Sequence, residues 1–132
     1  MPDATASTTG RHILVVDDER RNRQLLEVML GAEGYRVQCA SSGDEAIAMA
    51  VAEPPDLVLL DIMMPGMDGY RVATKLKSDA ATAHVPVVMV SALDDRNSRT
   101  HAINVGAAEF ITKPVNQVTL KALIKTLLSA GA

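Results

Sequence analysis

Short apolar runs alternate with longer amphipathic segments along this chain. The runs are rich in Val, Ile and Leu and are bounded by polar or turn-forming residues, a pattern typical of β-strands. In the run at residues 57–60, every position is apolar. Such a strand is expected to be buried on both faces, as in a parallel sheet covered by helices. The pattern predicts strands at residues 12–16, 35–39, 57–60, 85–90 and 109–111.

Each predicted strand is followed by a segment in which apolar residues recur at helical spacing. Ser41 or Ser42 is placed to cap the second of these helices, and Asp68 is placed to cap the third. Gly and Pro residues mark the helix ends. The pattern predicts helices at residues 20–33, 43–53, 69–78, from after 95 to 105, and from 116 towards the end of the chain.

Regular alternation of strands and helices, without a hairpin signal, predicts an α/β fold with a parallel sheet. Right-handed crossovers then place helices on both faces of that sheet. The length of 132 residues corresponds to one domain. Residues 1–10 are small and polar and are expected to form a flexible tail, whereas residues 11–130 are expected to form the folded domain.

Composition excludes several classes of function. The net charge of −3 leaves no basic footprint for nucleic acid, and only two Tyr and one Phe are available to stack on bases. No apolar run approaches the ~18 residues that a membrane-spanning helix needs. Cys39 is the only cysteine, so no intrachain disulfide can form and a cytoplasmic setting is expected.

Polar side chains follow the predicted strands at the points where they end. Asp17 and Asp18 follow the first strand, Asp61 the third, Ser91 the fourth and Lys113 the fifth. Because the carboxyl ends of parallel strands meet at one edge of the sheet, these groups are expected to converge there. Each residue taken alone is better explained as a polar strand end that meets solvent.

The convergent set has a chemistry of its own. Three carboxylates held close together repel one another unless a cation neutralises them. Mg2+ prefers oxygen ligands and is usually held by one or two carboxylates together with phosphate oxygens. A carboxylate is also a nucleophile toward phosphoryl groups and forms an aspartyl phosphate. The set therefore indicates a metal site beside a reactive carboxylate.

Four motifs follow one another along the chain: Val15–Asp18, Leu60–Gly69, Val90–Ala92 and Phe110–Pro114. As an ordered set they resemble the receiver domain of response regulators in two-component signalling, over roughly residues 11–130. The resemblance implies a doubly wound (βα)5 flavodoxin-like domain with strand order 2-1-3-4-5. Residues 77–90 and 113–116 are similar to receivers attached to diguanylate cyclases and hybrid sensor kinases.

By this resemblance, Asp61 is the phosphoacceptor. Asp18, Asp61 and the backbone carbonyl of Met63 would bind Mg2+ or Mn2+ directly, and Asp17 would do so directly or through water. The resemblance implies that Lys113 pairs with the phosphoryl group.

The resemblance also assigns a switch to two residues. Ser91 would donate its hydroxyl to a phosphoryl oxygen, and Phe110 would change rotamer as Ser91 moves. The residue at the position of Phe110 is often Tyr in relatives, so the phenolic hydrogen bond is missing here. The Lys113–Pro114 bond is usually cis in this family.

The implied function is a phosphorylation-activated switch in a two-component system or phosphorelay. The phosphodonor would be a histidine kinase, a histidine phosphotransfer protein or a small molecule such as acetyl phosphate. The fourth helix, fifth strand and fifth helix would form the face that controls a partner or output domain, and phosphorylation could create a homodimer. Apart from its own phosphorylation and slow dephosphorylation, the chain would not be an enzyme. Arg96, Arg99 and His101 are either partner contacts or a solvated helix face.

Three other classes of protein fit this sequence less well than the receiver domain does. A phosphatase of the haloacid dehalogenase type needs a second Asp two residues after the nucleophile, where Met63 stands. A Rossmann or P-loop domain needs glycines after the first strand, where residues 17–20 are charged. A pseudo-receiver that binds partners without phosphorylation is disfavoured by the complete set of acidic, hydroxyl and lysine groups.

Overall fold

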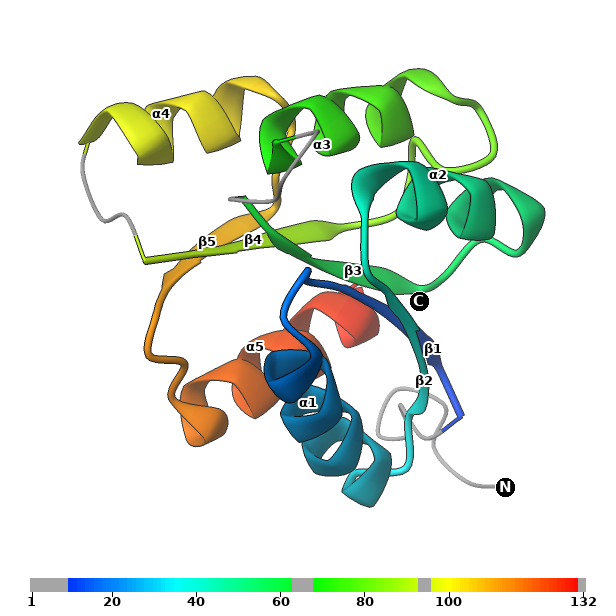
Figure 1. Ribbon diagram of the computed structural model, residues 1–132, viewed down its shortest axis with the longest axis vertical. Coiled ribbons are helices and arrows are strands. Elements are labelled where there is room, and N and C mark those ends of the chain that lie inside the picture. The colour runs from blue at the N-terminus through cyan, green and yellow to red at the C-terminus, as the bar shows by residue number, and fades with distance from the viewer. Residues whose placement is uncertain (1–9, 63–67, 93–95, 131–132) are drawn as a thin grey trace.

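Five parallel strands form the centre of the computed structural model, which describes residues 10–62, 68–92 and 96–130 (Figure 1). The strand order is β2-β1-β3-β4-β5, so the predicted doubly wound (βα)5 fold is confirmed. The tail predicted at residues 1–10 lies outside the described residues except for Gly10. The strands are β1 (His12–Val16), β2 (Arg36–Ala40), β3 (Leu57–Asp61), β4 (Val87–Ser91) and β5 (Glu109–Thr112).

Helices cover both faces of the sheet (Figure 1). α1 and α5 lie on one face, and α2, α3 and α4 lie on the other. Side chains alternate along β1: Leu14 belongs to the core beneath α2–α4, whereas Ile13 belongs to the core beneath α1 and α5. The helices are α1 (Arg20–Ala32), α2 (Gly43–Ala52), α3 (Gly69–Ser78), α4 (Arg96–Asn104) and α5 (Gln117–Ala130).

The predicted element boundaries shift by one or two residues. β4 begins at Val87 rather than at Val85, because Pro86 has no N–H for the ladder. The carbonyl of Pro86 nevertheless accepts the N–H of Val58 at 3.0 Å. Hydrogen bonding to β3 therefore begins one residue before β4. β3 includes Asp61, which places that carboxylate on the last residue of a buried strand.

The predicted helix caps are present. Of the two candidates for α2, Ser42 is the cap, and its hydroxyl accepts the N–H of Glu45 at 3.2 Å. The carboxylate of Asp68 accepts the N–H of Arg71 at 2.9 Å and caps α3. Each cap satisfies a backbone donor that the first turn leaves without a partner.

His12 begins β1 at the edge of the sheet opposite the polar cluster, and it is only 5% exposed. Neither ring nitrogen has a hydrogen-bond partner among the described residues. A buried polar group without a partner costs about 1–3 kcal/mol.

We expect His12→Val to raise the free energy of unfolding by about 1–2 kcal/mol, as measured by urea denaturation. The exposed His84 is a control, and His84→Val is expected to change little. Equal or lower stability for His12→Val would contradict this expectation.

Candidate functional site

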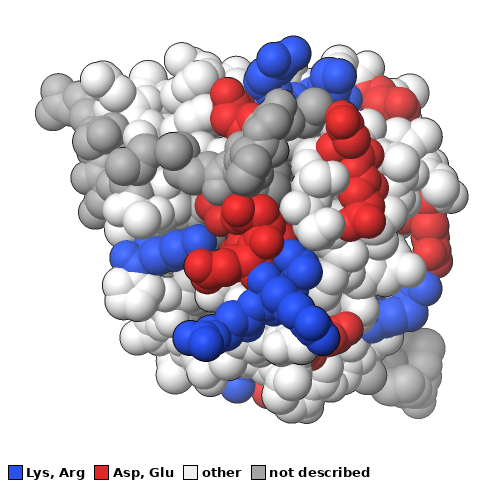
Figure 2. Space-filling model, in the orientation of Figure 1, with Lys and Arg blue, Asp and Glu red and all other residues white. Residues whose placement is uncertain are grey.

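The strand ends bring the predicted polar residues to one edge of the sheet. Carboxylate oxygens of Asp17, Asp18 and Asp61 lie within 4.8 Å of one another. Asp17 and Asp61 are nearly buried, with 4% and 7% exposure, whereas Asp18 is exposed. In the view of Figure 2, acidic side chains gather near the middle of the molecular surface, with basic side chains beside them. The cluster therefore combines two fixed, desolvated carboxylates with one that faces solvent.

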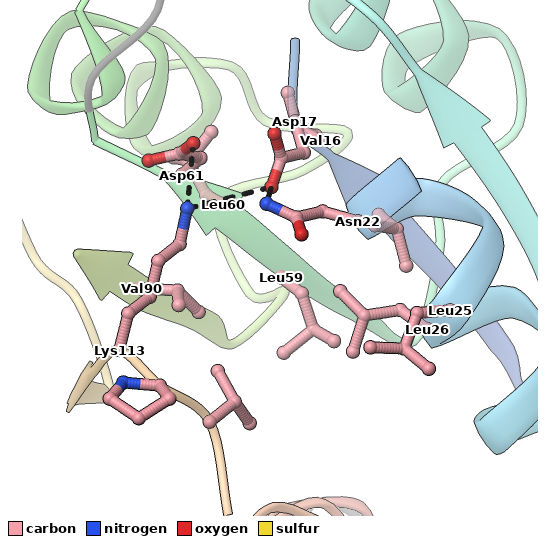
Figure 3. Close-up of a pocket in the computed structure, with 13 residues that line it drawn as sticks. Val16, Asp17, Asn22, Leu25, Leu26, Leu59, Leu60, Asp61, Val90 and Lys113 are labelled. Carbon is pink, nitrogen blue, oxygen red and sulfur yellow. Dashed lines mark hydrogen bonds and ion pairs between the residues drawn. The ribbon is translucent and has the colours of Figure 1, made fainter. Parts of the chain in front are cut away.

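Lys113 is the cation of the cluster. Its Nζ lies 3.2 Å from Oδ2 of Asp61 and 3.8 Å from Oδ2 of Asp17, so it pairs more closely with Asp61 (Figure 3). Its backbone N–H donates to the carbonyl of Ser91 at 2.7 Å, which joins the ends of β4 and β5. The bond to Pro114 is cis, as the resemblance implies. Three carboxylates and one ammonium leave the cluster with a formal charge of −2.

Local hydrogen bonds fix the orientation of Asp17. Its Oδ1 accepts the N–H of Glu19 at 2.8 Å, and its Oδ2 accepts Nδ2 of Asn22 at 3.3 Å (Figure 3). Arg23 also donates to the Asp17 carbonyl at 2.8 Å. Asn22 was not among the predicted site residues. A polar residue in the first turn of the helix after an acidic strand end is the signal that could have identified it.

Gly69 holds α3 close to the backbone of the phosphoacceptor candidate. Its N–H donates to the carbonyl of Ile62 at 2.7 Å. A Cβ on residue 69 would lie 2.6 Å from the carbonyl oxygen of Asp61 and 2.7 Å from Cα of Ile62. Both atoms belong to the backbone and cannot rotate away. Glycine is therefore required here by the close approach of α3 to the backbone of Asp61 and Ile62.

The two predicted switch residues are both buried. Ser91 is fully buried at the end of β4. Phe110, on β5, is 8% exposed and belongs to the core beneath α2–α4.

The α4 residues Arg99 and His101 were expected either to contact a partner or to form a solvated helix face. Both make contacts within this chain: Arg99 lies over the Phe110 ring and His101 stacks on Tyr70. The side chain of Arg96 and the carbonyl of Met63 lie outside the described part of the structure.

Two hollows meet at the acidic cluster. A polar one of about 210 Å³ is lined by the three aspartates, with Glu19, Asn22, Ala92 and Lys113. At about 30 Å³ per water molecule, it has room for a cation with several waters. A second, mostly apolar one of about 240 Å³ extends between α1 and the residues after β5, past Leu25, Leu26, Leu59 and Val115 (Figure 3).

The donor set fits a hard divalent cation. All three side chains offer carboxylate oxygens, which are the ligands that Mg2+ and Mn2+ prefer. The formal charge of −2 favours cation binding further. Among the described residues, no sulfur or imidazole group joins the cluster to favour a softer metal.

A doubly wound parallel sheet with this acidic edge defines a class: the receiver domain of a response regulator. The comparison of sequences agrees, because the profile of the family described as "Response regulator receiver domain" matches residues 13–125. The chain therefore belongs to this family, and the predicted resemblance is confirmed. Domains of this family typically bind Mg2+ at an acidic pocket, and their homologues act with histidine kinases and output domains.

Individual relatives agree with this assignment. Response regulator PleD of Caulobacter vibrioides is 50% identical over 115 residues, which are 87% of this chain and 25% of PleD. Protein PilH of Pseudomonas aeruginosa is 37% identical, over 89% of this chain and 97% of PilH. A CheY-like receiver domain protein from Methanospirillum hungatei JF-1 is similar in structure, with a TM-score of 0.88, 29% identity, and 93% and 97% of the two chains covered. The chain thus spans about a quarter of PleD and nearly all of PilH.

None of the described helices is long and apolar enough to span a membrane.

Proposed function

We propose that this chain is a phosphorylation-activated switch in which Asp61 accepts a phosphoryl group. The donor is the phosphohistidine of a histidine kinase or of a phosphotransfer protein. The observation that carries the proposal is the position of the Asp61 carboxylate, which ends a buried strand 3.2 Å from the Lys113 ammonium and beside two further carboxylates. Asp17 is held by hydrogen bonds from Glu19 and Asn22, whereas Asp61 is the carboxylate that pairs more closely with Lys113.

The reaction needs little from the protein beyond position and charge. A carboxylate oxygen of Asp61 forms a bond to phosphorus as the bond from phosphorus to the donor nitrogen breaks. Lys113 offsets negative charge on the transferring group. Asp17, Asp18 and Asp61 would hold Mg2+ or Mn2+ together with the Met63 carbonyl, and the metal would supply further charge neutralisation at the phosphoryl oxygens.

The phosphorylated state would be transmitted through β4 and β5. In this proposal the Ser91 hydroxyl moves to donate to a phosphoryl oxygen, and the Phe110 ring takes its inward rotamer in the space that Ser91 leaves. The bond from the Lys113 N–H to the Ser91 carbonyl supports this coupling, since it links the two strand ends directly. The face made by α4, β5 and α5 then controls a partner or output domain. The coupling free energy between phosphorylation and a change in such a face is typically about 1–3 kcal/mol.

Acetyl phosphate and Mg2+ provide a direct test with the purified chain. We expect a gain of one phosphoryl group, ~80 Da by mass spectrometry, because the site supplies the nucleophile and charge stabilisation itself. Chelation of the metal with EDTA is expected to prevent the gain, and neutral hydroxylamine to remove it, as for any acyl phosphate. A chain that gains no mass, or whose added mass resists hydroxylamine, would contradict the proposal.

A further inference from the structure

Phe110 is held in its buried orientation without a hydroxyl group. It is the single phenylalanine of the chain, and its side chain packs in the core beneath α2–α4. On β5 it lies opposite Met89 of β4, and Ala102 of α4 belongs to the same core. The ring itself can make no conventional hydrogen bond, so any specific restraint on it must come from a neighbouring side chain.

Arg99 of α4 supplies such a contact. Its guanidinium carbon lies 4.8 Å from the centre of the Phe110 ring, within the range of a cation–π interaction. Its Nη2 donates to the Thr112 hydroxyl at 3.2 Å. Thr112 lies two residues beyond Phe110 on β5 and directly before Lys113. Because Arg99 is exposed while the ring is buried, the guanidinium covers the ring on its solvent side.

The contact matters because α4 has a weak apolar anchor. Its sequence is mostly polar, and its buried side chains among those described are Ser98 and Ala102. On the side of α3, Tyr70 stacks on His101 with ring centres 3.8 Å apart, and the Tyr70 hydroxyl donates to the Ser98 carbonyl at 3.1 Å. On the side of β5, Arg99 makes the corresponding link. Arg99 therefore adds a polar link between α4 and β5 to the apolar contact that Ala102 makes in the core.

We propose that Arg99 is a positioning residue that holds the Phe110 ring in its buried orientation before phosphorylation. This inference rests on the proposed function, in which the inward ring accompanies the phosphorylated state. A contact that favours this state in advance favours phosphorylation as well, because the two equilibria are linked. Loss of a cation–π contact of this kind changes such an equilibrium about two- to fivefold.

The single phenylalanine allows a direct measurement of the ring. Incorporation of 4-fluorophenylalanine labels Phe110 alone, and the difference of its ¹⁹F shift between H2O and D2O reports solvent exposure. In the unphosphorylated chain, we expect Arg99→Ala to move the signal and to increase this difference. Arg36→Ala is the matched control. Arg36 is also exposed and forms an ion pair with Glu53, but it lies on β2, the outer strand on the other side of the sheet from β5. An unchanged signal in Arg99→Ala, or an equal change in Arg36→Ala, would overturn the proposal.

The rate of phosphorylation by acetyl phosphate provides the second readout. We expect Arg99→Ala to slow it about two- to fivefold, and Thr112→Val to slow it less. In a Phe110→Leu background, Arg99→Ala should have no further effect, because its action passes through the ring. A general loss of structure would instead slow phosphorylation in both backgrounds, and that result would overturn the assignment. If Arg99→Ala does not fold, the ¹⁹F signal and the rate of phosphorylation are measured on Arg99→Gln instead.

The two readouts separate the inference from the function on which it rests. If the parent chain gains no phosphate, the proposed function fails, and the ¹⁹F signal still decides whether Arg99 holds the ring. If the parent is phosphorylated but Arg99→Ala leaves the ¹⁹F signal of the ring unchanged, only the positioning role is overturned.

Discussion

The Asp61→Asn chain is expected to gain no phosphate from acetyl phosphate, while the parent chain gains ~80 Da. The amide keeps the shape of the side chain but is neutral and is not a nucleophile toward phosphorus. Loss of the nucleophile lowers the rate by on the order of 10³-fold or more. The neighbouring carboxylates are poor substitutes, because Asp17 is engaged by Glu19 and Asn22 and Asp18 is exposed. Mass spectrometry over a time course measures this rate.

Asp56→Asn is the matched control for this substitution. Asp56 lies directly before β3, at the end opposite Asp61, where it accepts the N–H of His12 at 2.7 Å. We expect the Asp56→Asn chain to be phosphorylated like the parent. A second readout is the rise in stability on addition of Mg2+, which is about 2.7 kcal/mol at 100 times Kd. The rise should be smaller for Asp61→Asn, since one of the three carboxylate ligands is lost. Phosphorylation of Asp61→Asn at the parent's rate would end the receiver mechanism proposed for this site.

Gly69→Ala is expected to damage both the fold and the site, although it adds only one methyl group. The new Cβ would lie 2.6 Å from the Asp61 carbonyl oxygen, so either α3 or the end of β3 must move. Overpacking of this kind costs about 1–3 kcal/mol in the free energy of unfolding. A displacement of the reactive carboxylate by about 1 Å can lower a rate on the order of 10²-fold. Urea denaturation and phosphorylation by acetyl phosphate measure the two effects.

Gly31→Ala separates the steric effect from the general effect of replacing glycine. Gly31 lies within α1, and a Cβ there would meet nothing within 4 Å. Alanine in an exposed helix is favoured over glycine by about 0.5–1 kcal/mol, so this substitution should stabilise the chain. Its rate of phosphorylation should remain that of the parent. If Gly69→Ala behaved like Gly31→Ala, the close approach of α3 to Asp61 would not restrict residue 69.

Much of the fold was predictable because its signals are local. Apolar runs, helical spacing and the caps at Ser42 and Asp68 depend on residues close together in the sequence, and each appears in the structure. The convergence of Asp17, Asp61 and Lys113 was also predictable, although they are far apart in sequence. Topology accounts for this, since the carboxyl ends of parallel strands share one edge of a sheet.

Other features were decided only by packing between elements. The sequence places Lys113 at the acidic edge, but the side-chain geometry makes it closer to Asp61 than to Asp17. The contact of Arg99 with Phe110 depends on how α4 lies against β5. Hydrophobic periodicity does not report such a contact, because a polar helix has no strong apolar face to set its orientation.

The sequence by itself therefore determined the order of the elements, the family and the residues at the acidic edge. The tertiary structure decided which partner each side chain has. It showed that Asn22 donates to Asp17, that Gly69 lies against the backbone of Asp61, and that Arg99 lies over the Phe110 ring. These contacts join residues on different elements, and their distances depend on close packing in three dimensions.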